Sequence, residues 1–148
     1  MNEEIKRRYQ ELKNRSREHI KEKNRESNIL LQECLSVLGN SKMILAPEQE
    51  REILDKFNSK LPSIMNSNIK KNVLTIQEMF PQWISKQVYI IWDKEGLPII
   101  QTDFECVIKY IDEVLAVSFE TWVVAEDMNQ FIQFDDANRI IEIFLKDN

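Results

Sequence analysis

Glycine and histidine are scarce in this chain. Its 148 residues include two glycines, Gly39 and Gly96, and one histidine, His19. Loops that cradle phosphates or dinucleotides need several closely spaced glycines, so the common nucleotide-binding motifs are excluded. A histidine-centred triad, a multi-histidine zinc site or a Cys–His pair would need partners that the chain does not place near His19. We therefore expect no catalytic residues, no metal site and no cofactor.

Long apolar runs and cysteines are also few. No run approaches the roughly 20 apolar residues of a membrane span, and the charged residues 1–8 lack the apolar core of a secretory signal. Cys34 and Cys106 lie far apart, inside predicted helices. These features predict a cytoplasmic protein with reduced, buried thiols and no membrane contact. A disulfide or a reactive thiol is the alternative.

The composition, 43% hydrophobic and 30% charged, is typical of a soluble globular protein. The length suits one domain that can bury a sizeable core. We expect a single domain over residues 1–148. Within it, residues 1–40 form a long charged helix, residues 47–86 form shorter helices, and residues 87–145 form a sheet with one helix.

The predicted sheet begins with the apolar run Val88–Trp92. A turn at residues 93–96 and a second apolar pair, Ile99 and Ile100, follow it, which is the pattern of a hairpin. Later apolar runs of strand length alternate with polar turns. The expected strands are Val88–Asp93, Trp122–Glu126, Gln130–Phe134 and Ile140–Leu145. For the last segment, a C-terminal helix capped by Asp136 remains an alternative.

The helices are predicted from caps and apolar spacing. Pro47 suits a first helical turn, and Pro62 is expected to end that helix. Residues 41–46 are predicted to form a connector, and residues 63–72 are predicted to form a loop. Thr102 and Glu105 have the spacing of a capping box, which opens a helix whose core face recurs every three or four residues. That face comprises Phe104, Val107, Ile108, Ile111 and Leu115. Together these elements predict an α+β fold with a mostly antiparallel sheet of four to five strands and a helix packed on one face.

Charge is unevenly distributed along the chain. Residues 1–80 contain 15 Lys/Arg and 12 Asp/Glu, whereas residues 81–148 contain 5 Lys/Arg and 13 Asp/Glu, a net charge of −8. Such acidity repels nucleic acid and attracts basic proteins. The acidic residues gather at predicted strand ends and turns, where they form a hypothetical partner-binding surface. These residues are Asp93, Glu95, Asp103, Asp112, Glu113, Glu126, Asp127, Asp135 and Asp136.

Other interpretations of these residues stay open. Turns and helix caps favour aspartate for backbone reasons alone, and paired carboxylates could also serve a hydrolase. Trp83, Trp92 and Trp122 could stack on bases or sugars, but Trp92 and Trp122 lie within apolar runs that are typical of a core.

The segments Val88–Asp93 and Asp112–Trp122 resemble a pattern in small bacterial proteins. Some of those proteins act as immunity, or antitoxin-like, proteins of polymorphic toxin systems. The resemblance covers roughly residues 87–127, and it implies a cytoplasmic protein that binds and blocks a cognate toxin. The acidity of this region would suit a basic toxin such as a nuclease.

These observations favour a non-catalytic protein-binding function, as an immunity-type inhibitor of a basic toxin. One alternative is an adaptor that associates through the charged N-terminal helix. A carboxylate-based hydrolase is a further alternative.

Overall fold

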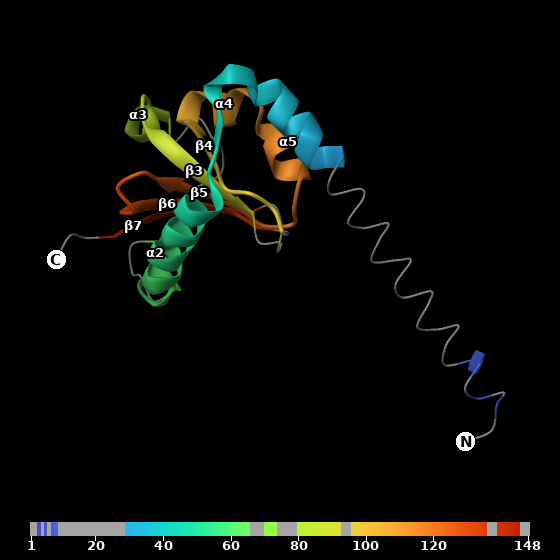
Figure 1. Ribbon diagram of the computed structural model, residues 1–148. Helices are drawn as coiled ribbons and strands as arrows, with labels where there is room; N and C mark the ends of the chain where they lie inside the picture. The colour runs from blue at the N-terminus through green and yellow to red at the C-terminus, as the bar shows by residue number, and fades with distance from the viewer. Residues whose placement is uncertain are drawn as a thin grey trace.

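The computed structural model describes residues 3, 5, 7, 8, 29–65, 70–73, 80–92, 96–135 and 139–145. Seven strands form one antiparallel sheet in the order β1-β4-β3-β5-β6-β7-β2 (Figure 1). The strands are β1 (Met43–Ile44), β2 (Lys70–Val73), β3 (Gln87–Trp92), β4 (Ile100–Asp103), β5 (Thr121–Ala125), β6 (Gln130–Phe134) and β7 (Ile140–Phe144). The helices are residues 29–38, η1 (Gly39–Ser41), α2 (Pro47–Met65), α3 (Phe80–Trp83), α4 (Phe104–Lys109) and α5 (Ile111–Ala116). The predicted α+β class is confirmed.

The centre of the sheet is the apolar run that the sequence predicted as a strand. β3 pairs with β4 on one side and with β5 on the other, so the predicted hairpin is confirmed. From Val88 to Trp92 every side chain of β3 is buried, and so is every side chain of β5. Strands covered on both faces have continuous apolar sequences instead of alternating ones.

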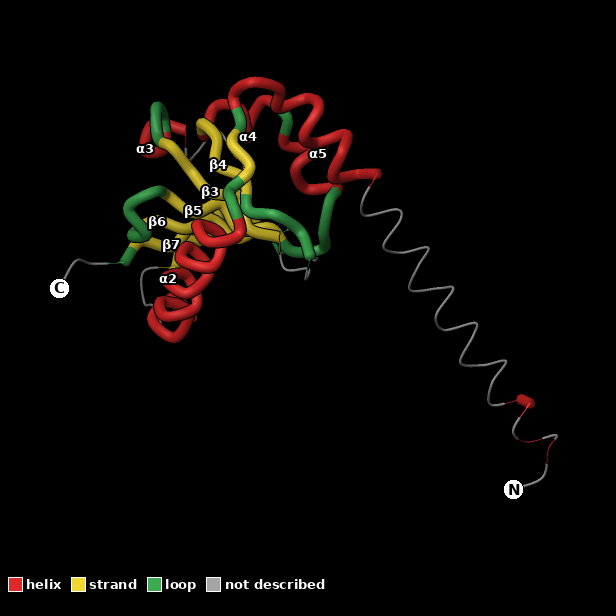
Figure 2. Tube along the Cα trace, in the orientation of Figure 1, coloured by secondary structure: helices red, strands yellow, loops and turns green. Residues whose placement is uncertain are grey.

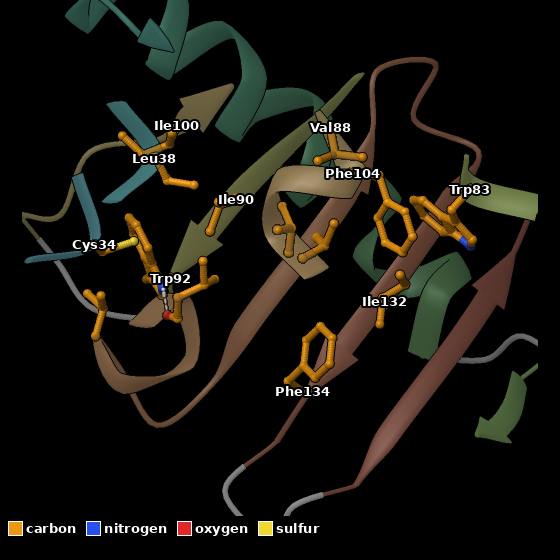
Figure 3. Close-up of a cluster of buried hydrophobic side chains, with 14 of the residues drawn as sticks. Cys34, Leu38, Trp83, Val88, Ile90, Trp92, Ile100, Phe104, Ile132 and Phe134 are labelled. Atoms are coloured by element: carbon orange, nitrogen blue, oxygen red, sulfur yellow. Dashed lines mark hydrogen bonds between the residues drawn. The ribbon is translucent and has the colours of Figure 1, made fainter. Parts of the chain in front are cut away.

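Helices cover both faces of the sheet, whereas the sequence predicted helix on one face only (Figure 2). On one face, residues 31–38, Trp83, α4 and α5 pack over Val88, Ile90 and Trp92 (Figure 3). The indole Nε1 of Trp92 donates a hydrogen bond to the Val114 carbonyl at 3.0 Å. On the other face, α2 packs Phe57 and Ile64 over the sheet. The spacing of Ile53, Leu54, Phe57 and Leu61 predicts one buried stripe on this helix, but it does not show which face of the sheet the stripe would cover.

The sheet is wider than predicted because two strands come from segments interpreted as connectors. β1 lies within the predicted connector 41–46, and β2 overlaps the predicted loop 63–72. Both are edge strands, which need fewer apolar residues than central strands. β7 pairs with both β6 and β2, so the strand prediction for residues 140–144 is confirmed and the helical alternative is wrong.

Two predicted helix boundaries are wrong. Helix α2 continues through Pro62 to Met65, because residues beyond the proline still bury a side chain, Ile64. The helix predicted over 103–115 is divided at Tyr110, whose backbone (φ −115°, ψ 34°) leaves the helical region. The predicted capping box does not form, because the Thr102 hydroxyl donates to the Ser41 carbonyl at 2.9 Å. The predicted charged helix 1–40 lies largely outside the described residues. Thr75 and Glu78, whose spacing also predicts a capping box, lie wholly outside them.

Candidate functional site

A hollow of about 560 Å³ lies between α2 and the sheet, and we call it the α2 groove. One wall is α2, from Glu50 to Met65, and residues 96–99 close one side. Two other hollows on the described surface are smaller, at about 330 and 360 Å³. The α2 groove is therefore the first place to look for a binding site.

The floor of the groove is fixed by strand register. Ile91 of β3 lies opposite Trp122 of β5, which lies opposite Gln133 of β6. The three side chains form one row on the face that α2 covers, and all three line the groove. Phe57 of α2 meets Trp122 edge-on, with ring centroids 5.3 Å apart at 67°. This packing makes most of the groove floor apolar, with Gln133 as its polar member.

Two carboxylates add negative charge to this apolar setting. Glu50 lies in the first turn of α2, and Glu120 directly precedes β5. Among the described residues that line the groove, these are the charged groups, and both are acidic. The Gln133 side-chain amide donates to Glu120 Oε1 at 3.2 Å and orients that carboxylate. An apolar groove with acidic groups fits a side chain that has an apolar stem and a cationic head.

Large apolar side chains are exposed near the same site. Met65, at the end of α2, lines the groove and is 62% exposed. Phe119, the residue before Glu120, is 85% exposed. Aromatic residues and methionine are enriched at protein–protein interfaces, so their exposure here favours a protein partner.

Three of the acidic residues predicted to bind a partner share the far end of the sheet. Asp103 ends β4, and Glu126 and Asp127 follow β5 at the end opposite Glu120. Asp103 accepts a hydrogen bond from the Gln87 side chain. Asp127 accepts the Asn129 backbone N–H at 3.0 Å, which is the turn role that aspartate often plays.

The remaining predicted residues lie elsewhere. Asp112 and Glu113 belong to α5, over the face away from α2. Asp135 follows β6 at the Glu120 end, where it accepts the Arg139 backbone N–H at 2.9 Å and Arg139 Nε at 2.8 Å. Its side chain is only 6% exposed, so it is largely occupied by Arg139 and little of it is accessible to a partner. Asp93, Glu95 and Asp136 lie outside the described residues. The described acids thus do not share one edge of the sheet.

Sequence reasoning missed Glu50 and Glu120. In the sequence, Glu50 is explained by its place in the first turn of the helix that begins at Pro47, where a negative charge is favourable, and so it does not stand out as a site residue. The position of Glu120 directly before a buried strand was a usable signal, since such residues lie at a sheet end. Which face and which helix it would meet depended on α2, whose packing the sequence did not reveal.

The cysteines are both free, so the disulfide alternative is wrong. Burial raises the pKa of the Cys34 thiol from its ordinary 9.0 to about 11, with nearby Glu113 raising it further and Lys42 opposing. A thiol with a raised pKa is a poor nucleophile. Within the described residues, no three His, Cys, Asp or Glu side chains gather as metal ligands, and no helix could cross a membrane.

Comparison of the sequence with models of protein families gives a match. The sequence model of the family described as "CdiI immunity protein EcoliA0-like" matches residues 28–143, more than three quarters of the chain. The chain belongs to this family. The resemblance to bacterial immunity proteins is therefore confirmed, and it extends well beyond residues 87–127. The match to CdiI immunity proteins includes α2, strands β1 to β6 and β7 as far as Ile143, and so the whole α2 groove. A comparison with curated proteins finds no match.

Proposed function

We propose that this protein is a non-catalytic inhibitor that binds a cognate, basic toxin and neutralises it. The match to CdiI immunity proteins over residues 28–143 carries the proposal. An immunity protein acts by association, so it needs a partner-binding surface and no reactive groups of its own. The buried, weakly nucleophilic Cys34 and the exposed apolar side chains near the α2 groove support this interpretation.

The basic character of the partner is inferred from charge. Residues 81–148 have a net charge of −8, and exposed carboxylates lie on α5 and after β5. Such a distribution attracts a cationic protein over long range and increases its rate of encounter. The exposed Asp112 and Glu126 and the half-buried Glu113 are our candidates for this steering role, because Asp127 and Asp135 already accept backbone hydrogen bonds. We call these three residues the steering acids.

The proposal is tested by protection. The toxin domain encoded by the gene adjacent to this one is expressed in a susceptible bacterial strain, with and without this protein. We expect survival only with the protein present, together with a complex of the two purified proteins. Failure to protect and to form a complex would contradict the proposal. Protection without any complex would also contradict it, because the protein would then act on the toxin's product and not on the toxin.

A further inference from the structure

We infer that the α2 groove is where the toxin inserts a basic side chain, lysine or arginine, between α2 and the sheet. This inference rests on the proposed function and adds to it the contact site and the chemistry of the inserted group. The groove volume, about 560 Å³, is within the range of sites that enclose a bound group. It can accept the long apolar stem of a basic residue with its head directed at a carboxylate.

Charge complementarity identifies the occupant. Glu50 and Glu120 come from two different elements, and both are half-buried among apolar groups. A half-buried carboxylate has lost part of its hydration, and a cation placed beside it restores favourable interactions. The amide of Gln133 already holds Glu120, so this acceptor is oriented before a partner arrives. Preorganised acceptors favour tight, slowly dissociating contacts.

The other hollows fit this occupant less well. The hollow beside Gln87 and Glu126 also contains Lys86, whose ammonium group would repel an entering cation. Lys86 already donates a hydrogen bond to Gln130 at that place. The hollow along residues 29–36 is lined by one exposed helical surface. The α2 groove alone among the three combines an apolar wall and floor with carboxylates from separate elements.

The groove acids and the steering acids should have separable effects on binding kinetics. The double variant Glu50→Gln/Glu120→Gln keeps the shape of the groove and removes its charge. We expect its complex with the toxin domain encoded beside this gene to dissociate at least about tenfold faster, with an association rate within about threefold of wild type. The triple variant Asp112→Asn/Glu113→Gln/Glu126→Gln is the matched control, and it should mainly slow association.

A second variant tests the groove without changing its charge. Asn58 is an exposed residue of α2 that lines the groove, so Asn58→Trp should fill it and weaken binding more than about tenfold. Ser63→Trp adds the same side chain to an exposed α2 position outside the groove lining, and it should leave affinity within about threefold. Urea unfolding of each variant verifies that it is folded. If Glu50→Gln/Glu120→Gln were unfolded, the comparison of Asn58→Trp with Ser63→Trp would decide whether the toxin binds in the groove.

The possible failures are distinguishable. Tight wild-type binding with unchanged dissociation in both Glu50→Gln/Glu120→Gln and Asn58→Trp would overturn the groove assignment and leave the proposed function standing. Absence of wild-type binding to the toxin domain would overturn both. Equal weakening by Asn58→Trp and Ser63→Trp would also overturn the assignment, because the effect would then not be specific to the groove.

Discussion

The three tryptophans show how single residues connect distant parts of this chain. Trp83 Nε1 donates to Glu142 Oε2 at 3.1 Å, which joins α3 to β7, and Trp92 Nε1 joins β3 to α5. Trp122 packs against Phe57 and also forms the groove floor. The sequence predicted Trp92 and Trp122 as core residues, and both are buried. It did not predict the groove role of Trp122, because that role depends on α2, a helix 57 to 75 residues earlier in the chain.

Cys34 should make the folded protein less stable at high pH. Because burial raises the pKa of its thiol to about 11, the folded state keeps its proton where the unfolded chain begins to lose it, above pH 9. The contribution of this thiol to the free energy of unfolding is therefore complete below pH 9. As the pH rises from 9 to 11, the free energy of unfolding falls by about 2 kcal/mol. The pKa of Tyr89 is also raised, mainly by burial, so the deprotonation of this side chain adds to the loss of stability at higher pH.

Urea unfolding of wild type and Cys34→Ala between pH 8 and 11 tests this expectation. The variant should start from a lower free energy of unfolding, because it leaves a cavity, but it should lose less stability as pH rises. Parallel pH profiles for the two proteins would contradict the assignment to Cys34.

At the scale of elements, α2 contains a proline that does not end it. Pro62 lies three residues before the last residue of the helix and is exposed. A proline there removes a backbone N–H that would bond the carbonyl four residues earlier. We expect Pro62→Ala to raise the free energy of unfolding by about 2 kcal/mol, after allowing for the greater entropy of the unfolded variant.

Chemical denaturation measures this effect, with Pro47→Ala as the matched control. Pro47 is the first residue of α2, where proline is well tolerated, so its replacement should change stability by less than about 1 kcal/mol. A Pro62→Ala variant no more stable than wild type would contradict the expected cost of a proline within the last turn of α2.

The elements differ in how well the sequence predicts them. Strands β3, β5, β6 and β7 were predictable because their apolar runs are bounded by turn residues. Edge strands β1 and β2 were not, since Lys70–Val73 has the composition of a loop and becomes a strand by pairing with β7. The break at Tyr110 was also hidden, because apolar spacing continues through it. Long-range pairing and packing, which leave little local trace, account for these differences.

For the molecule as a whole, the structure divides the acidic residues by role. Asp127 and Asp135 accept backbone hydrogen bonds, and Glu50 and Glu120 line the α2 groove. Of the steering acids, which lie elsewhere, Asp112 and Glu126 are exposed and Glu113 is half-buried. The sequence correctly showed an acidic half but not this division. Exposed charges act on a partner before contact, whereas groove charges act after it.

The most direct test of the account is the association rate of this protein with its toxin domain as a function of ionic strength. Stopped-flow mixing from about 10 mM to 1 M salt spans screening lengths from about 30 Å to 3 Å. We predict that the wild-type rate falls steeply with salt, and that Asp112→Asn/Glu113→Gln/Glu126→Gln starts slower and falls less. A wild-type rate that does not change with salt would contradict recognition of a basic toxin by this acidic protein.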